Sequence, residues 1–169
     1  TTTLGDWYRG VPRAVGFPDG TSVSATLDAS GNITSVTNEL GFTTSYAYDA
    51  GGRVSQVTHP SGDSVAWAPT TISTVPVAAV EYGIPAGHWR QTVSTGNARR
   101  ITYFDGFWRP RLVHEYDTSN VAGTQRFTVQ DYDADGRASF SAYPVSSLST
   151  VADASQGTWT LYDLLGRPT

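Results

Sequence analysis

The residues best able to do chemistry in this chain lie in a short signature that occurs five times. An aromatic residue or Leu precedes Asp, two further residues follow, and then come Gly or Trp and finally Arg or Asn. The five copies are Leu27-Asp28…Gly31-Asn32, Tyr48-Asp49…Gly52-Arg53, Phe104-Asp105…Trp108-Arg109, Tyr132-Asp133…Gly136-Arg137 and Tyr162-Asp163…Gly166-Arg167. Tyr and Arg recognise carboxylates and sugars, so one interpretation is a repeated ligand site.

A structural interpretation of the signature is stronger. Asp at the start of a turn accepts backbone N–H groups, and Gly three residues later tolerates a positive φ. Arg can pair with a neighbouring carboxylate or stack on the aromatic ring of the next copy. Because a catalytic group would not be needed five times, we predict that the signature is structural, that the chain has no catalytic residues and that it is not an enzyme.

One copy overlaps a sequence typical of metal sites. Asp131-Tyr132-Asp133-Ala134-Asp135-Gly136 has the opening of a calcium-binding loop, but the twelfth position, which needs a bidentate Glu, is Ala142. The three histidines, at positions 59, 88 and 114, share no metal-ligand spacing. We therefore predict no metal and no cofactor, and we place His114 at a solvated strand end.

A possible nucleophile is also present. Gly62-Asp63-Ser64 resembles the nucleophile block of the GDS-type lipases and esterases, which would require a later Asp-x-x-His. The later His114 is preceded at that distance by Arg111 instead of Asp. We predict no hydrolase activity at Ser64.

The composition indicates which elements must position these residues. The 169 residues include 23 Thr, 16 Val and 20 aromatic residues, which favour strands, but only 8 Leu, 3 Glu and no Lys. Seventeen Gly and nine Pro interrupt the chain at short intervals. We predict an all-β fold. The absence of Cys excludes disulfides and thiolate chemistry.

The signature belongs to a longer repeat. Residues recur at intervals of 21 in five columns, namely Gly10/Gly31/Gly52, Val15/Val36/Val57, Gly20/Gly41/Gly62, Ala25/Tyr46/Trp67 and Asp28/Asp49. Alternating runs between turn residues make each unit a β-hairpin. We divide a single 1–169 repeat segment into three 21-residue units (1–67), an insertion or degenerate unit (68–98) and further, longer units (99–169).

Here the sequence resembles a known family. Ser45-Tyr46-Ala47-Tyr48-Asp49-Ala50-Gly51-Gly52-Arg53-Val54 is similar to the YD-repeat consensus of the Rhs (rearrangement hotspot) family, as are the copies at Tyr132 and Tyr162. The copy at Phe104 departs from it, because Trp108 replaces the turn glycine, and we expect that turn to be built differently. The resemblance implies tandem antiparallel hairpins in a curved sheet, either open or part of a hollow β-shell.

The resemblance also implies a function. In bacterial Rhs and toxin-complex proteins such shells enclose a C-terminal toxin, so we expect a structural wall segment that encapsulates or displays a separate effector. The expected partners are the rest of the parent chain and that effector, and the expected location is secreted or cell-surface. The chain has no Asp-Pro dipeptide, a feature of the self-cleaving segment that commonly ends such shells. The alternative function is a carbohydrate- or cell-surface-binding adhesion module that uses exposed Trp67, Trp89 and Trp108.

Charge and hydropathy limit the remaining partners. A net charge of −4 gives no basic surface for nucleic acid, and no apolar run is long enough to span a membrane. The chain has no Lys that could keep another strand from pairing with a sheet edge, and at a net charge of −4 the repulsion between two copies of the chain is weak. We therefore expect self-association through the sheet edges.

Overall fold

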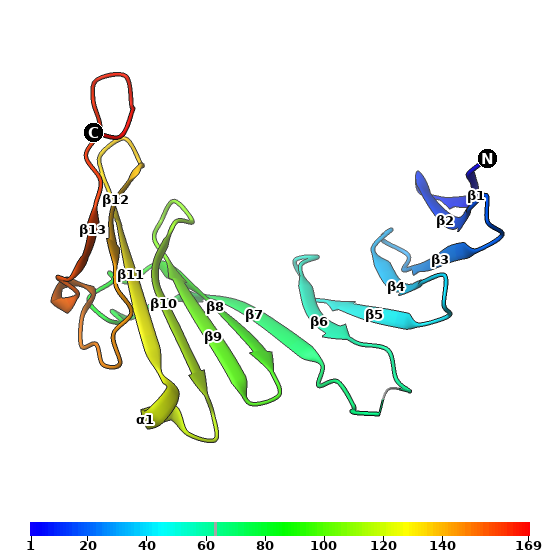
Figure 1. Cartoon of the computed structure of the whole chain (residues 1–169), viewed down its shortest axis with the longest axis horizontal. Coiled ribbons are helices and arrows are strands. Elements are labelled where there is room, and N and C mark those ends of the chain that lie inside the picture. Colours follow the sequence, from blue (N-terminus) through cyan, green and yellow to red (C-terminus); the bar gives the residue numbers. More distant parts are fainter. Residues whose placement is uncertain (63) are drawn as a thin grey trace. The chain divides into compact units, whose positions relative to one another are not determined.

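The computed structural model describes residues 1–62 and 64–169, and almost all of its regular structure is β. The thirteen strands are β1 (Thr3–Tyr8), β2 (Val11–Gly16), β3 (Ser22–Leu27), β4 (Ile33–Thr37), β5 (Thr43–Tyr48), β6 (Val54–Thr58), β7 (Thr70–Val77), β8 (His88–Thr95), β9 (Ala98–Phe104), β10 (Pro110–Asp117), β11 (Arg126–Tyr132), β12 (Ala138–Ala142) and β13 (Gly157–Trp159). Two short helical turns, α1 (Val121–Thr124) and η1 (Val151–Asp153), interrupt the later connections (Figure 1).

The strand order in the sheet is the order along the chain, from β1 to β13. Each strand pairing that the structure describes is antiparallel, as expected for consecutive hairpins. The prediction of an all-β fold made of tandem hairpins in an open sheet is therefore confirmed. The chain divides into two compact units, Thr1–Ile72 (unit 1) and Ser73–Thr169 (unit 2), and β7 contains the division.

Unit 1 contains the 21-residue repeat. Its register places Ala25 opposite Val36 and Tyr46 opposite Val57, so residues of two repeat columns become cross-strand neighbours. In β3 and β5 the side chains alternate between exposed and half-buried, which is the period of a strand with one drier face. Among the described residues of unit 1, none is fully buried.

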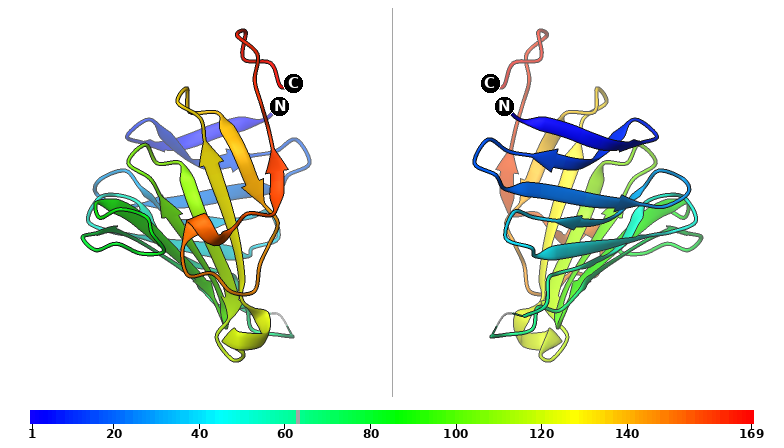
Figure 2. Two further views of the ribbon diagram at one scale, coloured as in Figure 1. Left: turned by 90° about the vertical axis from the view of Figure 1, so that its left-hand side faces the viewer. Right: turned by 90° about the vertical axis from the view of Figure 1, so that its right-hand side faces the viewer.

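Unit 2 holds the buried core. Its fully buried apolar side chains come mainly from β9 to β12 and are Ile84, Tyr103, Leu112, Phe127, Val129, Phe140 and Ala142. Ile101 of β9 also packs against this core. The other covering side chains come from two connections: Tyr82 precedes Ile84 in the first, and the second supplies Val145, Leu148, Val151 and Ala154. Figure 2 shows this second segment, which carries η1, folded against β11 and β12. The backbone N–H of Val151 donates to the Tyr82 carbonyl at 2.9 Å, which ties the two connections together.

The segment at 68–98 forms regular structure. It supplies β7, β8 and the connection that carries the buried Ile84. Hence residues outside the 21-residue period build part of the core of unit 2. None of the helices within residues 1–62 and 64–169 combines the length and the hydropathy that a membrane crossing requires.

Candidate functional site

The five signature copies form five turns with one hydrogen-bond pattern. In each, the Asp N–H donates to the carbonyl four residues later, at 2.8–2.9 Å, and the fourth residue donates back to the Asp carbonyl at 2.9–3.1 Å. One carboxylate oxygen of the Asp accepts the N–H groups two and four residues on, as in Gly51 and Arg53 to Asp49. The same pair of bonds occurs at Asp28, Asp105, Asp133 and Asp163.

The second carboxylate oxygen of the Asp explains the last residue of the signature, the Arg or Asn four positions after the Asp. It accepts the Nε of Arg53, Arg109, Arg137 or Arg167 at 2.7–2.8 Å in four of the turns. In the remaining turn Asn32 Nδ2 donates to Asp28 at 2.9 Å. Arg and Asn therefore do the same work, because each supplies a side-chain donor to the turn Asp.

These hydrogen bonds keep the turn carboxylates ionised. The Arg53 backbone N–H is the largest cause that lowers the pKa of Asp49, and for Asp28 the largest cause is the Asn32 side chain. At Asp133 burial raises the pKa, but the hydrogen bonds from Arg137 outweigh it and the net shift is downward. A carboxylate that is held ionised in this way is poorly suited to act as a general acid.

The residue three positions after the Asp, which is Gly or Trp in the signature, has a left-handed backbone conformation. Four of the turns place Gly there, with φ between 76° and 93° at Gly31, Gly52, Gly136 and Gly166. The fifth places Trp108 at φ 61° and retains every backbone bond of the pattern. Our expectation that this turn is built differently was wrong. Its Trp adopts the glycine conformation and gains ring contacts in compensation, since its indole stacks on Trp89 at 4.9 Å and 24° and lies 5.6 Å from the Phe104 ring.

The aromatic residue of the signature links one turn to the preceding one. Tyr48 Oη donates to the Ile33 carbonyl at 2.7 Å, Tyr132 Oη to the Pro110 carbonyl at 3.0 Å and Tyr162 Oη to the Ala138 carbonyl at 2.9 Å. Each residue whose carbonyl accepts the bond directly follows the Arg or Asn that ends the preceding signature. The signature places an aromatic residue before the Asp in four of its five copies, but the target of each Tyr hydroxyl is fixed only by the strand register.

In unit 2 a cation–π contact reinforces the same link. The Arg109 guanidinium lies 4.5 Å from the Tyr132 ring centroid, and that of Arg137 lies 4.6 Å from Tyr162. Together with the Tyr hydrogen bonds, these contacts form what we call the turn ladder. It runs through three successive turns of unit 2, those of Asp105, Asp133 and Asp163.

At the opposite end of the hairpins of unit 1, the connection between β4 and β5 uses a related turn, of the kind that the glycine column at this end predicts. Asn38 Oδ1 accepts the N–H groups of Leu40 and Phe42, and Gly41 has φ 82°. Asn thus replaces the turn Asp. The available signal was the Gly20/Gly41/Gly62 column, which places a glycine at the same offset in each unit.

The calcium-like sequence is fully engaged in ion pairs. Asp131 pairs with Arg111, while Asp133 and Asp135 pair with Arg137 at 2.7 and 2.8 Å. The described residues hold no group of three or more His, Asp or Glu side chains arranged to bind a metal. In the lipase-like tripeptide, Asp63 lies outside the described residues.

The histidines of unit 2 are buried, contrary to our expectation for His114. His114 is 8% exposed and its ring stacks on Phe127 at 4.0 Å, because β10 turns this residue toward the core face. Its Nε2 is buried without a hydrogen-bond partner. Burial lowers the pKa of His114. His88 is 3% exposed, and its ring nitrogens lie near the Pro85 carbonyl and Glu81.

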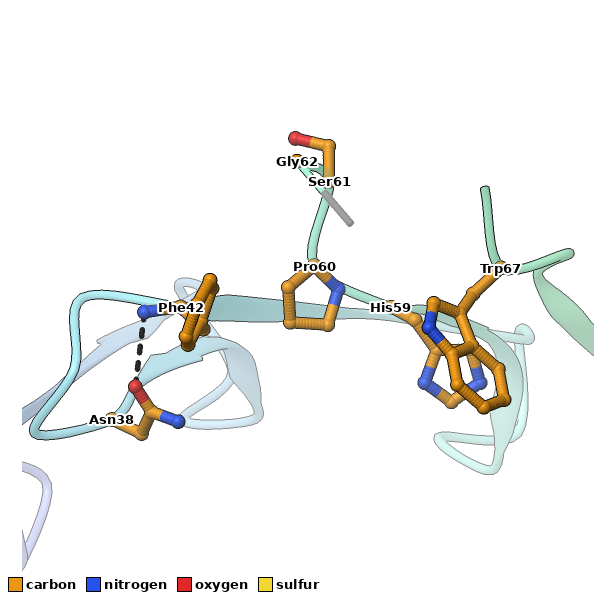
Figure 3. Close-up of a pocket in the computed structure, with 7 residues that line it drawn as sticks. All are labelled: Asn38, Phe42, His59, Pro60, Ser61, Gly62 and Trp67. Carbon is orange, nitrogen blue, oxygen red and sulfur yellow. Dashed lines mark hydrogen bonds between the residues drawn. The ribbon is translucent and has the colours of Figure 1, made fainter. Parts of the chain in front are cut away.

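The three tryptophans expected to be exposed lie in different surroundings. Trp67 is 66% exposed and lies beside His59, with ring centroids 6.0 Å apart, in a recess of about 620 Å³ that also includes Phe42 and Pro60 (Figure 3). Trp108 is 49% exposed. Trp89 is only half-buried, because it is stacked beneath Trp108, so its expected free exposure was wrong.

The fold and its turns define a β-repeat protein made of tandem hairpins. Residues 28–64 match the family model described as RHS Repeat, a range that includes β4 to β6 and the turns of Asp28 and Asp49. Over this range the chain is similar to an RHS repeat, which bears out the resemblance to the Rhs/YD-repeat family seen in the signature. A search of curated proteins gave no match. The three turns of unit 2 lie outside the matched range but share its hydrogen-bond pattern.

Proposed function

We propose that this chain is a structural wall segment of an Rhs-type β-shell that encapsulates or displays a separate effector. The turn ladder is the observation that carries the proposal. At three places one hairpin offers the next a backbone carbonyl, and at the two of these in unit 2 it also offers a guanidinium face. A contact that recurs between successive hairpins lets a sheet grow by addition of similar units, as in other repeat proteins.

The chemistry of the signature supports a structural role without catalysis. The turn carboxylates accept backbone N–H groups and a side-chain donor in all five copies. Because both oxygens of each carboxylate accept hydrogen bonds from the same turn, the signature offers no free pair of carboxylates to a substrate. The proposed partners are the remainder of a parent chain and its effector, in a secreted or cell-surface protein of bacterial origin.

Enclosure is tested by proteolysis of the parent polypeptide with its effector in place. We expect the effector to resist thermolysin for much longer in that polypeptide than when it is produced alone. Equal digestion rates in the two settings would contradict enclosure. Digestion of the wall repeats, followed in the same samples, distinguishes protection of the effector from general resistance of the protein.

We also propose that the isolated chain associates through a sheet edge. At the β13 edge Trp159 is 67% exposed, and Leu161, two residues beyond the end of β13, is 71% exposed. An unpaired edge strand is a template for another chain. Sedimentation velocity over a wide range of concentrations should show dimers or larger species. Leu161→Lys, which adds a charge at this edge, should shift the protein toward monomer.

The matched control is Leu40→Lys. Leu40 is 79% exposed but lies in a turn of unit 1, between β4 and β5 and away from either end of the strand order. This variant should associate as the parent does. A well-folded parent that stays monomeric at the highest concentration would rule out edge pairing.

A further inference from the structure

Two of the three signature turns in unit 2 carry large apolar side chains at their tips, which are the two residues that follow the turn Asp. Phe107 is 80% exposed, Leu165 is 77% exposed and Leu164 is fully exposed. The other signature turns have only Ala, Ser, Gly or Asp at these positions, at 29–30, 50–51 and 134–135. Because those turns keep the same backbone hydrogen bonds, the turn itself does not require apolar tips.

The three turns lie next to one another at one end of the strands of unit 2. A Cβ on Gly136 would lie 3.3 Å from Nη1 of Arg109, and a Cβ on Gly166 would lie 3.6 Å from Nη1 of Arg137. Figure 1 shows the β9–β10 connection, the β11–β12 connection and the C-terminal hairpin at the same end. Successive turns are two strands apart, so they are spaced by about 10 Å. The apolar tips therefore flank the middle turn, in a line of about 20 Å.

The shape of these tips favours one kind of partner. Exposed apolar side chains that are gathered in one region mark contacts with proteins or with membranes. A protein partner would need a separate pocket for each projecting tip, at matching distances on both sides of a polar turn. A lipid layer needs no matching shape, because its acyl chains are fluid, and aromatic and aliphatic side chains enter its interface readily. A lipid surface is therefore the partner that projecting tips fit.

The charged groups of the turns are arranged with the guanidinium outermost. The Arg167 side chain is 71% exposed, whereas the Asp163 side chain, which accepts the backbone N–H groups of the turn, is 26% exposed. The same order holds in the turns of Asp105 and Asp133. A guanidinium binds phosphate through paired hydrogen bonds. These groups are thus placed to meet lipid phosphates when the tips enter the layer.

The net charge of the turns indicates which lipids are needed. Asp135 lies at the tip of the middle turn and pairs with Arg137 at 2.8 Å. The three turns together contain three Arg and four Asp residues, so they have no excess of positive charge. Electrostatic attraction to an anionic layer is therefore weak. Binding must depend on the apolar tips and on phosphate groups, which uncharged phosphatidylcholine layers also present.

From these observations we propose that the turn end of unit 2 binds a phospholipid surface. Phe107, Leu164 and Leu165 enter the layer at the level of the upper acyl chains, and the guanidinium groups of the turns bind lipid phosphates. Only the tips enter the layer. This binding is independent of the wall function and of association through the β13 edge, and the tests of those proposals do not report on it.

Vesicle flotation tests the proposal, with vesicles of phosphatidylcholine alone and with added phosphatidylglycerol. The parent should bind both kinds with affinities within about threefold, and binding should persist in about 0.5 M NaCl, where charge interactions are screened. The double variant Leu164→Ser/Leu165→Ser should bind at least tenfold more weakly. Its turn should fold, because Ser30 occupies a tip position in another signature turn, and an unchanged urea midpoint verifies this.

Two further variants test the position of the contact. Ala134→Phe adds an apolar side chain to the middle tip and should strengthen binding severalfold. Leu40→Ser removes an exposed Leu from a turn of unit 1 and should bind as the parent does. Leu161→Lys, which is designed to oppose edge pairing, should also retain lipid binding.

Several outcomes would overturn the proposal. One is no binding by the parent at millimolar lipid, and another is unchanged binding by the folded double Ser variant. Binding that needs phosphatidylglycerol and is lost in about 0.5 M NaCl would identify adsorption by charge instead of insertion of the tips. An equal loss in Leu40→Ser would show that exposed apolar side chains bind lipid wherever they lie. Loss of binding in Leu161→Lys but not in the double Ser variant would move the contact to the β13 edge.

Discussion

At the scale of single residues, Trp108 shows how the turn tolerates an exception. A left-handed conformation costs a non-glycine residue about 1–2 kcal/mol. Aromatic stacking contributes about 0.5–1.5 kcal/mol beyond the area it buries. The contacts of Trp108 with Trp89 and Phe104 therefore offset much of the strain at φ 61°. The same conformation without such contacts should be costly.

Gly136→Val tests that cost. Gly136 has φ 83°, and a Cβ there would lie 3.3 Å from Nη1 of Arg109. We expect the free energy of unfolding to fall by about 1–3 kcal/mol through backbone strain. Urea denaturation measures it. Gly106→Ala is the control, because Gly106 lies in a signature turn outside the left-handed region with open space around it, and this variant should change little.

Tyr132→Phe tests the hydroxyl of the turn ladder. The substitution keeps the ring under Arg109 but removes the donor to the Pro110 carbonyl and to Gln130. We expect a loss of about 1 kcal/mol, typical of one half-buried hydrogen bond. Tyr143→Phe, at a Tyr that is 59% exposed, should leave the melting temperature unchanged. Equal losses in the two variants would show that the hydroxyl has no special role in the ladder.

At the scale of elements, strand β10 holds a titratable group inside the core. His114 stacks on Phe127, and Tyr82 and Tyr116 are its other ring neighbours. None of these is anionic at neutral pH, so a protonated His114 would have no counter-charge among its ring neighbours. Its buried Nε2 has no hydrogen-bond partner in the folded state.

This arrangement predicts acid sensitivity of unit 2. Burial lowers the pKa of His114 below its ordinary value of 6.5, so the unfolded chain binds the extra proton first. Stability should be complete above pH 6.5 and should fall as the pH drops from there toward the folded-state pKa. Thermal unfolding at about pH 7 and about pH 5 measures the change, before the acidic turn residues protonate.

His114→Phe is the informative variant for this prediction. It retains an aromatic ring against Phe127 and removes the titration, so its stability should vary less over that pH range. His59→Asn, in unit 1, should keep the pH dependence of the parent. An unchanged pH dependence in His114→Phe would assign the effect to another group.

At the scale of the whole molecule, the two units differ in how they are stabilised. Among the described residues seven apolar side chains are buried, and all of them lie in unit 2, whereas those of unit 1 are at most half-buried. Unit 1 depends on its ladder of strand hydrogen bonds and on its turns. Without a buried core, a single-layer sheet should open locally more often.

Native-state hydrogen exchange tests this difference. Amides of β9 to β11 should exchange through rare opening events and be strongly protected. Those of β3 to β6 should exchange faster at the same pH. Equal protection in the two sets of strands would mean that unit 1 is stabilised by contacts beyond its own sheet, for example in an assembly of several copies, and dilution would then restore the difference.

The sequence alone determined the local structure of this protein. Alternating residues and the recurring Asp and Gly required hairpins, because strand pleating and turn geometry are set by residues only a few positions apart. The all-β fold, the hairpin order and the repeat family followed from that local information. The presence of Asn32 where the other copies have Arg is also explained, once the last residue of the signature is understood as a side-chain donor to the turn Asp.

Only the tertiary structure decided what lies on each face. The burial of His114, the stack of Trp108 on Trp89 and the covering of the core by residues from two connections join segments far apart in the chain. They depend on strand register and on which face is covered, and a shift of one residue would exchange the faces. Cross-strand neighbours such as Thr102, Val113 and Thr128 are fixed in the same way, because only the sheet brings their three strands together.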